Sequence, residues 1–588
     1  MCGITGVFST HLPPQALRAA AEQMQAALVH RGPDDAGLWG GEQAALAHQR
    51  LSILDLSAAA RQPMSTPDGR FHLSFNGEIY NFRELRNSLE KEGACFHTNS
   101  DTEVILELYV RYKAGCVQQL RGMFAFAIWD SLERTAFLAR DPLGIKPLYL
   151  HERDGTLAFA SELRALRQSR LFVPTLSTRA VQRYFESGSV PEPLTLINEC
   201  FALGAGETLL WRDGKSTRHT YWQLHFNAEI ISDPVRHTRE ALLDSVRHHF
   251  VSDVPVGVFL SGGIDSTAIL ALANATGHRG LSACSIAVDE AAADESATAR
   301  RSATHFGADY HEMRLNAEAA QGLFGRYLEH VDQPTIDGLN TFAVSSLARE
   351  NGLKVVLSGL GGDELFGGYS SFTKIPRMMR WHKALRFVPG VATMLARGQS
   401  RHRRMADYLR SPGSAEDAFA ALRGIFSKEE ARQLTQWITG CDSAITTEIP
   451  GPCGGGTVQD RISSLEITRY MRNQLLRDSD VMSMAHGLEL RVPLVDRTLF
   501  EAVARIPASR RLLPGKRLLT EAVPEVPEWV VNQPKRGFLF PYQKWLGGEW
   551  GEAFAKGARG APVEMPSWYQ QWSLFVLRHS MARLGLAS

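Results

Sequence analysis

Several features that would place the chain in a common class are missing from its 588 residues. No run of about 18 apolar residues occurs, so the sequence predicts no membrane-spanning helix. The first residues, MCGITGVFSTHLPP, contain neither a basic stretch nor an apolar core, which argues against a signal peptide. Lys plus Arg number 64 and Asp plus Glu number 63, so the basic excess typical of nucleic-acid-binding proteins is absent. We expect a cytoplasmic protein whose partners include neither membrane nor nucleic acid.

Two further patterns are lacking. The 7 cysteines are scattered and show no CxxC or Cys/His spacing typical of zinc sites. In a long chain this predicts buried thiols in a reducing compartment. The pattern GxxxxGK[ST] is also missing, so the sequence has no Walker-type ATP site.

The first 160 residues combine short apolar runs with turns and a few helical patterns. Strands are predicted at 71–76, 123–130 and 157–161, and a helix at 102–112 with Ser100 or Asp101 as its cap. Strand-rich pieces with helices between them predict layered sheets covered by helices.

From residue 235 the pattern changes to strands that alternate with helices, which predicts a doubly wound parallel α/β domain. The predicted helices are 235–250 and 266–275, and the predicted strands are 254–260, 282–288 and 354–359. We divide the chain into a first domain at 1–215, a connector to about 234, and a second domain at 235–588.

The second domain also carries features outside the alternating pattern. Residues 370–460 are predicted to be a peripheral helical insertion that ends in the loop GPCGGG (451–456). Its basic stretch, 377–404, is typical of a solvated helical surface; a polyanion-binding surface or a lid over a phosphate-bearing substrate is the alternative. The aromatic residues in 567–586 have helical spacing and predict a packed helix.

Cys2 has unusual chemistry because it follows Met1 directly. Removal of Met1 would leave Cys2 with both a thiol and a free α-amino group. An α-amine has a reference pKa of about 7.7–8.0 and is therefore an available base at neutral pH. One terminal residue could then supply nucleophile and base together.

Five motifs accompany this cysteine: RGPDD (31–35), HQRLSILD (48–55), NGEIYN (76–81), SDTEVIL (100–106) and RDPLGIKPLY (140–149). In their order and spacing, residues 1–160 resemble the glutaminase domain of class II (N-terminal nucleophile) amidotransferases. The resemblance implies a layered α/β/β/α fold in which Cys2 attacks the side-chain amide of glutamine through a thioester.

Residues that match the family's motifs suit the other steps of this chemistry. A tetrahedral oxyanion needs fixed donors, which the Asn76 side chain and the Gly77 backbone would supply. Arg50 would bind the α-carboxylate of glutamine, and Asp101 its α-ammonium group. The rest of the predicted glutamine-binding set is Leu51, Ser52, Ile53, Leu54 and Glu78.

The second signal is SGGIDS at 261–266, between a predicted strand and a predicted helix. Glycines let backbone N–H groups converge on an anion, and the helix N-terminus adds partial positive charge. Ser261 and Ser266 add hydroxyl donors. The motif resembles the PP-loop of the ATP pyrophosphatases, which implies cleavage of ATP to AMP and pyrophosphate by way of an acyl-adenylate.

The same resemblance implies the other ligands of ATP and Mg²⁺. Asp265 and Asp363 would be the metal ligands, because Mg²⁺ favours one or two carboxylates together with phosphate oxygens. Ser358 and Gly359 belong to VLSGLGGDELFGGY (356–369), and Lys535 to NQPKRGF (532–538). The full predicted ATP-binding set is Leu260, Ser261, Gly262, Gly263, Asp265, Ser266, Ile286, Ser358, Gly359 and Lys535.

The order of the two domains, over roughly residues 1–540, resembles the glutamine-hydrolysing asparagine synthetases. This implies aspartate as the default acceptor, an internal ammonia tunnel and, from the resemblance alone, a homodimer. The stretch PTIDGLNTF (334–342) differs from what is expected of the aspartate-specific enzymes. In addition, Leu360 stands where a glutamate is usual, and leucine cannot accept a proton. Either another carboxylate replaces it, Glu364 being nearest in sequence, or the acceptor is a different carboxylate from cell-surface glycan or secondary metabolism.

Other functions fit the sequence less well. Class II relatives that make phosphoribosylamine or glucosamine phosphate lack SGGIDS. Ring-closing relatives, such as β-lactam synthetases, usually lack the nucleophilic cysteine. A non-catalytic glutamine or nucleotide sensor should have lost site residues, and only Leu360 is altered here.

Overall fold

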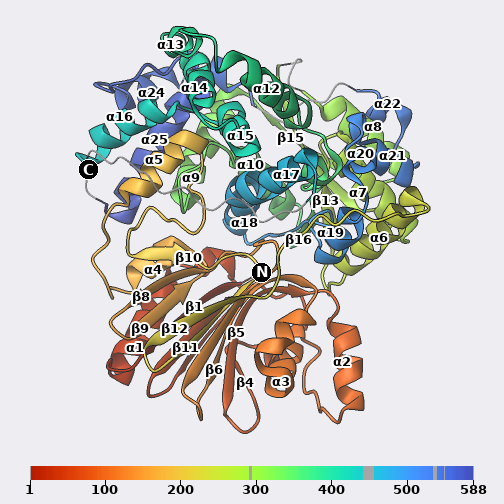
Figure 1. The fold of residues 1–588 in the computed structure, drawn as a ribbon. Helices are drawn as coiled ribbons and strands as arrows, with labels where there is room; N and C mark the ends of the chain where they lie inside the picture. Colours follow the sequence, from red (N-terminus) through yellow and green to blue (C-terminus); the bar gives the residue numbers. More distant parts are fainter. Residues whose placement is uncertain (1, 291–293, 442–455, 534–539, 549, 587–588) are drawn as a thin grey trace.

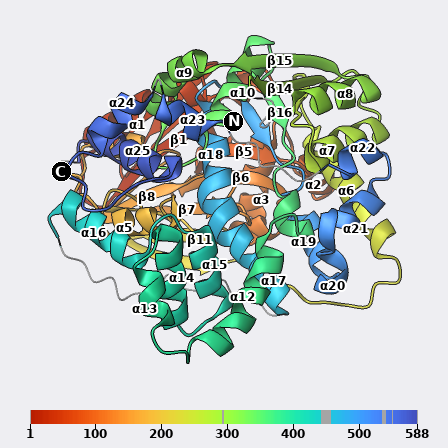
Figure 2. The same ribbon diagram turned by 90° about the horizontal axis from the view of Figure 1, so that it is seen from above.

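The computed structural model describes residues 2–290, 294–441, 456–533, 540–548 and 550–586. Its N-terminal half is built on two antiparallel sheets and its C-terminal half on one parallel sheet (Figure 1). The chain begins where the two halves meet. Seen from above, the helices of residues 371–423 gather along one edge of the C-terminal half, away from the edge that carries α8 (Ser296–Phe306) and β15 (Asp309–Leu315) (Figure 2).

The two N-terminal sheets have six strands each and pack face to face. The first has the order β10 (Cys200–Ala202), β8 (Tyr149–Arg153), β9 (Thr156–Ala160), β1 (Gly3–Ser9), β3 (Ala44–Arg50) and β2 (Asp35–Gly40). The second has the order β12 (Lys215–Thr220), β11 (Glu207–Arg212), β7 (Thr135–Arg140), β6 (Gly122–Asp130), β5 (Phe71–Ile79) and β4 (Met64–Ser65).

Helices cover the outer face of each sheet. On the first sheet lie α1 (Pro14–Ala26) and α4 (Leu163–Gln168), and on the second lie α2 (Phe82–Lys91) and α3 (Asp101–Tyr112). Helix α3 begins as predicted, because the Ser100 side chain accepts a hydrogen bond from the Thr102 amide at 3.0 Å. The predicted layers of helix, sheet, sheet and helix are confirmed.

The C-terminal sheet is entirely parallel, which confirms the second predicted fold class. Its order is β15 (Asp309–Leu315), β14 (Ser282–Val288), β13 (Val256–Phe259), β16 (Val355–Leu357) and β17 (Glu489–Arg491). The sequence predicted only the middle three. Strand β15 was missed because four of its seven residues (Asp309, His311, Glu312 and Arg314) are charged or histidine, and β17 because it has only three residues.

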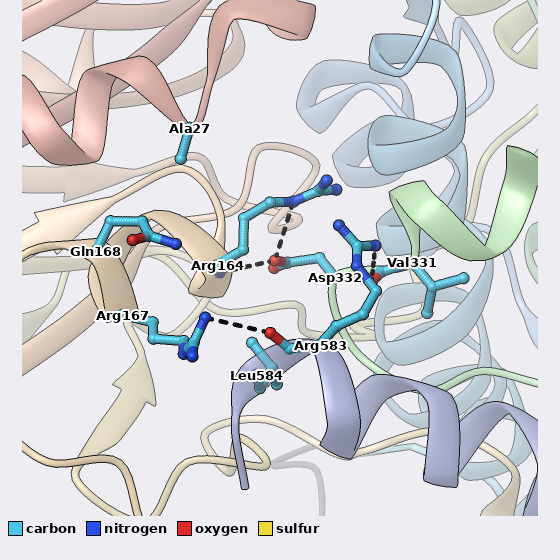
Figure 3. Close-up of a pocket in the computed structure, with 8 residues that line it drawn as sticks. All are labelled: Ala27, Arg164, Arg167, Gln168, Val331, Asp332, Arg583 and Leu584. Atoms are coloured by element: carbon cyan, nitrogen blue, oxygen red, sulfur yellow. Dashed lines mark hydrogen bonds and ion pairs between the residues drawn. The ribbon is translucent and has the colours of Figure 1, made fainter.

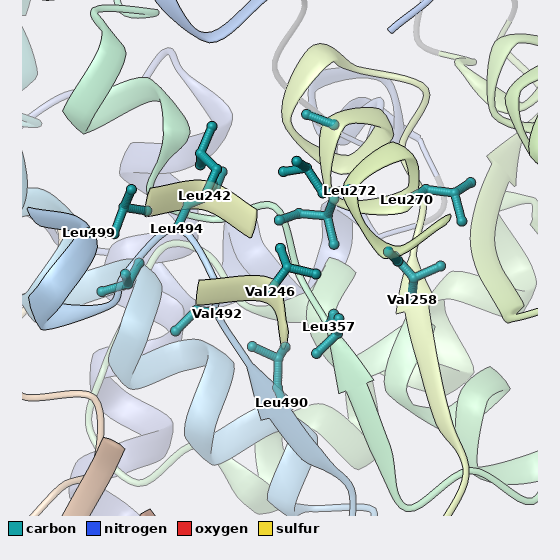
Figure 4. Packing of buried hydrophobic residues seen from close by; sticks show 14 of the residues in the cluster. Leu242, Val246, Val258, Leu270, Leu272, Leu357, Leu490, Val492, Leu494 and Leu499 are labelled. Carbon is teal, nitrogen blue, oxygen red and sulfur yellow. The ribbon is translucent and has the colours of Figure 1, made fainter. Parts of the chain in front are cut away.

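The apolar core of this half lies between the sheet and its helices (Figure 4). Leu242 and Val246 come from α6 (Pro234–His249), and Leu272 from α7 (Ile264–Ala275). They pack near Val258 of β13 and Leu357 of β16. Burial of each such side chain contributes about 1.5–3 kcal/mol, so the core holds β13 and β16 at fixed spacing.

The predicted insertion is helical wherever it is described. Its helices are α12 (Ser371–Leu385), α13 (Val391–Ala396), α14 (Ser400–Arg410), α15 (Ala415–Arg423) and α16 (Lys428–Thr439). Arg377, Arg380 and the exposed Trp381 line an open groove on α12. The loop GPCGGG lies outside the described residues except for Gly456.

One long helical rod follows the insertion. It consists of α17 (Val458–Leu465), the π-helical segment η4 (Glu466–Leu476) and α18 (Arg477–Met484). Near the C-terminus, α25 (Trp568–Leu584) is the packed helix that the sequence predicts, because Trp572 is fully buried against Phe324, with ring centroids 4.7 Å apart.

Further helices are α5 (Thr178–Ser187), α8 (Ser296–Phe306), α9 (Ala317–His330), α10 (Leu339–Glu350), α11 (Gly362–Phe366), α19 (Arg497–Ala504), α20 (Ala508–Arg511), α21 (Arg517–Ala522), α22 (Glu528–Val531), α23 (Tyr542–Gly547) and α24 (Gly551–Gly557). Among the described residues, no helix has the length and apolar composition that a membrane span requires.

Candidate functional site

The two sheets of the N-terminal half bring Cys2 and Asn76 together. Cys2 directly precedes β1 of the first sheet, and Asn76 lies in β5 of the second. The Cys2 amide donates a hydrogen bond to Asn76 Oδ1 at 2.9 Å. Burial raises the pKa of the Cys2 thiol, and Sγ lies 4.0 Å from the Leu51 carbonyl oxygen.

The side-chain amide of Asn76 has an unused hydrogen-bond donor. Asn76 is fully buried, and its Nδ2 has no hydrogen-bond partner within the described part of the chain. A buried donor without a partner costs about 1–3 kcal/mol, so its position beside Cys2 points to a ligand that would accept from it. Next to it, a Cβ atom on Gly77 would lie 2.0 Å from the Met123 carbonyl oxygen, which leaves room only for glycine.

Arg50 ends β3 and fixes the loop that follows it. Its guanidinium group donates to the carbonyl oxygens of Ser57 at 3.0 Å and Asp55 at 2.5 Å. The predicted glutamine-binding residues Leu51, Ser52, Ile53 and Leu54 lie in this loop. The Ile53 carbonyl accepts from the Asp253 amide at 3.1 Å, so the loop also contacts the C-terminal half.

Glu78 and Asp101 are the predicted glutamine-binding residues that follow Asn76 and Gly77 in the sequence. Asp101 opens α3 and accepts a hydrogen bond from the Ile79 amide at 2.9 Å; burial raises its pKa to about 6. Glu78 is buried, 3.5 Å from Arg491 of the C-terminal half. The predicted glutamine set thus comes from adjacent elements; within it Arg50 donates to the Leu54 carbonyl oxygen at 3.5 Å, and Asn76 also contacts Cys2.

No role was predicted for Arg31 itself, although it begins the motif RGPDD (31–35). It is fully buried and donates from Nε to the Cys2 carbonyl oxygen at 3.1 Å. Its other nitrogens pair with Glu162 at 3.0 Å and with Asp480 of α18 at 2.8 Å. The residue that precedes β1 is therefore held by a side chain that also reaches the C-terminal half.

The SGGIDS segment forms the turn between β13 and α7. Gly262 has φ of 75°, a conformation that favours glycine. The hydroxyls of Ser261 and Ser266 lie 3.1 Å apart across the turn. Neighbouring strands β13 and β16 are the point where the strand order reverses, and ligands of open α/β sheets bind beyond the carboxyl ends of such strands.

The segment after β16 packs directly on this turn. A Cβ on Gly359 would lie 2.6 Å from the Ser266 amide nitrogen, and one on Gly362 would lie 2.3 Å from Asp265 Oδ1. The glycines of the second motif therefore allow Ser358 and Leu360 to come beside the loop. Leu360 donates its amide to Ser358 Oγ at 3.4 Å.

The two candidate metal ligands share one lysine that the sequence did not single out. Lys516 pairs with Asp363 at 2.5 Å and also with Asp265. Burial lowers the pKa of Lys516, but the two carboxylates more than offset this and the net direction is upward. Its only sequence signal is the turn LPGK, which is weak. Predicted Lys535 lies outside the described residues.

Asp265 and Asp363 fit Mg²⁺, because this ion prefers one or two carboxylates together with phosphate oxygens and both side chains lie beside the candidate phosphate loop. In the parts of the chain that are described, no group of three or more His, Cys, Asp or Glu side chains comes together as a metal site. The phosphates of ATP would have to complete the coordination.

A cavity of about 270 Å³ opens beside the loop. Its lining includes seven of the predicted ATP-binding residues: Leu260, Ser261, Asp265, Ser266, Ile286, Ser358 and Gly359. Leu360 lines it too, with Asp337 and Asp478, which the sequence did not single out. Glu364, the predicted substitute for the acidic residue absent at 360, is not among the described residues that line the cavity. It is buried and accepts a hydrogen bond from Tyr369 at 2.8 Å.

A smaller cavity of about 100 Å³ lies at the junction of α4 and α25 (Figure 3). Its arginines are engaged by protein groups: Arg164 faces Asp332, with 3.7 Å between Nε and Oδ1, and Arg167 donates to the Arg583 carbonyl oxygen at 3.3 Å. This cavity is part of the contact between the two halves.

Family models match both halves. A glutamine amidotransferase domain matches residues 1–222, and an asparagine synthase domain matches residues 237–570. The pairing defines a glutamine-hydrolysing, ATP-dependent carbon–nitrogen ligase. The second match spans more than half of the chain, which therefore belongs to the asparagine synthase family, a family that uses ATP as a substrate.

The chain is similar to several curated proteins along nearly its whole length. It is 35% identical to asparagine synthetase [glutamine-hydrolyzing] 1 of Bacillus subtilis (strain 168), over 94% of this chain and 89% of that protein. It is 34% identical to a putative asparagine synthetase of Mycobacterium tuberculosis (strain ATCC 25618 / H37Rv), over 93% and 88%. It is also 29% identical to amidase chry2 of Gibberella zeae, over 93% and 90%.

Proposed function

We propose that the chain hydrolyses glutamine at Cys2 and transfers the ammonia to a carboxylate that it activates with ATP. The observation that carries the proposal is the unpartnered Asn76 amide beside Cys2, in a chain that also has the SGGIDS turn at the carboxyl ends of β13 and β16. The first supplies a donor for an oxyanion, and the second a cradle for phosphate.

In the first reaction, Cys2 Sγ bonds to the side-chain carbonyl carbon of glutamine, and ammonia leaves. Asn76 Nδ2 and the Gly77 amide would donate to the oxyanion. The α-amine of Cys2, freed by removal of Met1, would carry the proton. Water then cleaves the thioester and releases glutamate. Arg50 and Asp101 would bind the α-carboxylate and α-ammonium of glutamine, with Leu51, Ser52, Ile53, Leu54 and Glu78 around them.

In the second reaction, a carboxylate oxygen of the acceptor bonds to the α-phosphorus of ATP, and pyrophosphate leaves. The Ser261–Ser266 turn, with Gly262 and Gly263, would hold the phosphates, and Leu260, Ile286, Ser358 and Gly359 the rest of the nucleotide. Mg²⁺ held by Asp265 and Asp363 would neutralise phosphate charge, and Lys516 would add a second cation. Lys535 stays a predicted phosphate contact.

Ammonia then attacks the acyl carbon and AMP leaves. Water would compete at this step unless it is excluded. An apolar cluster supports a dry passage, because it joins Leu51, Met123 and Ile145 of the N-terminal half to Leu476 and Met484 of the C-terminal half.

Aspartate is the first acceptor to test, since the family model is that of asparagine synthase. Leu360 favours a second candidate, a different carboxylate, because leucine brings no acid to the cavity wall. The domain limits 1–215 and 235–588, a homodimer and a cytoplasmic location remain predictions; the six described cysteines are free thiols, which is compatible with a reducing compartment.

The test is Cys2→Ala. Glutamine-dependent amide formation should fall by about four orders of magnitude or more, because the nucleophile is gone. With ammonium chloride in place of glutamine, pyrophosphate release should stay within about twofold of the parent protein, since the two sites act in separate steps. Retained glutamine use by the variant would contradict the assignment of Cys2.

A further inference from the structure

Two carboxylates that the proposed reactions do not use line the cavity beside the nucleotide loop. Asp337 lies in the turn before α10, and Asp478 lies in α18. The two segments touch, because a Cβ on Gly338 would lie 3.4 Å from Asp478 Cβ. Both carboxylates therefore share one wall of the cavity that also contains Leu360.

Neutral groups hold these carboxylates in place. The Gly338 amide donates to Asp337 Oδ1 at 2.8 Å, and the side chain of Gln474 also bonds to Asp337. Thr335 donates its hydroxyl to Asp478 Oδ2 at 2.5 Å. These hydrogen bonds fix the positions of the two carboxyl groups.

The nearest protein cations lie outside the described lining of the cavity. The described residues that line the cavity include three aspartates and no lysine, arginine or histidine. Arg477, beside Asp478 in the chain, donates to the Val190 carbonyl oxygen at 2.8 Å. Lys516 is engaged by Asp265 and Asp363. Burial raises the pKa of Asp478 to about 7; the charge of Arg477 opposes this shift, and the charge of Asp337 adds to it.

We propose that Asp337 and Asp478 bind an ammonium group of the acceptor, which is a carboxylic acid with a protonated amine and without a second free carboxylate. This inference rests on the proposed function, because it concerns the substrate of the same ATP site. An ammonium donates three hydrogen bonds and relieves the repulsion between the two carboxylates.

The same wall disfavours free aspartate. Its α-carboxylate would lie near two like charges, and the cavity lining, as far as it is described, offers it no cation. An acid whose α-carboxyl is already in amide linkage has no such conflict. The apolar side chains of Val344, Leu360, Leu475 and Leu490 suit the aliphatic stem of such an acid.

The experiment measures pyrophosphate release with ATP, Mg²⁺ and ammonium chloride, so that it does not depend on glutamine hydrolysis. The acceptors are L-aspartate, its α-amide, L-glutamic acid α-amide and the N-acetyl derivatives of both α-amides. We expect the KM of the better α-amide to be at least about tenfold below that of aspartate, and N-acetylation to raise it by about tenfold or more, because a charge-assisted hydrogen bond is lost.

Variants separate a direct role from a structural one. Asp337→Asn and Asp478→Asn should each raise the KM of the preferred α-amide by about tenfold, with a smaller change in the KM of ATP. Asp309→Asn, on the exposed edge of the same sheet, is the matched control and should change neither. A larger Mg²⁺ requirement with an unchanged acceptor KM would assign the pair to a metal and overturn the inference.

The remaining outcomes are distinct. Preference for free aspartate, or equal KM values for an α-amide and its N-acetyl form, overturns the inference and leaves the proposed function standing. Absence of pyrophosphate release from every acid overturns the synthetase half of the proposed function and this inference with it.

Discussion

The two candidate sites are built in different ways. The glutaminase site takes its groups from strand ends and one helix start within residues 2–101, and its arginines already bind backbone carbonyls, as Arg31 does to Cys2 and Arg50 to Asp55. The synthetase site draws on loops after β13 and β16, on α18 and on Lys516. Its carboxylates are held close together, with one lysine between two of them.

This difference distinguishes a largely preorganised site from a site whose negative charges are available to bind ligands. In the glutaminase site, protein groups bond to most of the described polar atoms, and Asn76 Nδ2 has no hydrogen-bond partner among the described residues. In the second, Asp337 and Asp478 lie side by side without a cation among the described lining residues. Substrate binding should therefore change the electrostatics of the second site far more than those of the first.

The largest effect should come from Asp265→Asn. Removing one carboxylate from the pair proposed to hold Mg²⁺ at the phosphates should slow pyrophosphate release by about 10²–10³-fold, because stabilisation of the charge on the departing pyrophosphate is lost. Release from the purified variant is measured with ammonium chloride as the nitrogen source, and glutamine hydrolysis by the same preparation reports on folding. Unimpaired pyrophosphate release would remove the phosphate role of the SGGIDS turn.

Asn76→Ala tests the other site. Loss of one oxyanion donor should lower kcat for glutamine hydrolysis by about 10²-fold while the KM for glutamine changes little. Asn76→Asp is the companion variant, since it keeps the acceptor for the Cys2 amide and removes the donor. Equal losses in both variants would support the donor role, whereas full activity of the aspartate variant would argue against it.

A paired comparison tests the contact between the halves. Arg31→Met leaves Glu162 and Asp480 as buried charges and should lower the free energy of unfolding by about 3–5 kcal/mol. Lys354→Met breaks a partly exposed pair with Asp34, 2.8 Å long, and should cost about 0–1 kcal/mol. Chemical denaturation of both variants measures the difference, and similar costs would contradict the central place of Arg31.

The last prediction concerns pH. Burial, with Asp363 nearby, raises the pKa of Glu364 to about 8 from its ordinary 4.5. The folded chain therefore keeps a proton that the unfolded chain has released. The free energy of unfolding should fall as pH rises from about 4.5 to 8, by up to about 1.4 kcal/mol per pH unit from this group, and level off above. Denaturation at pH 6 and pH 8 should show a smaller difference for Glu364→Gln than for the parent protein; equal differences would speak against this.

Sequence reasoning could propose candidate residues where a site is local in the chain. Short motifs mark Cys2, Asn76 and the SGGIDS turn as candidates, and strands such as β5, β6 and β14 follow directly from apolar runs. It failed where distant segments meet. Nothing near Lys516 marks it as the partner of Asp265, because that contact spans 251 residues and depends on how α21 packs.

Asp337 and Asp478 were missed for the same reason. Each is an ordinary polar residue in its own segment, and only the contact between the turn before α10 and α18 makes them a pair. Glu364 shows the converse: proximity in sequence to Leu360 suggested a role at the cavity, but α11 turns its side chain to Tyr369.

The helical rod α17–η4–α18 carries residues that contact both halves of the chain, and the number of residues in the rod fixes where each of them points. Gln474 bonds to Asp337, and Asp478 lines the 270 Å³ cavity, while Asn473 accepts from the Glu192 amide at 3.1 Å and Asp480 pairs with Arg31. Deleting one residue from the π-helical segment would rotate everything after it by about 100°. Asp478 would then leave the cavity and Asp480 would leave Arg31 at once. The length of that one segment is therefore a shared constraint on substrate recognition and on the docking of the two halves.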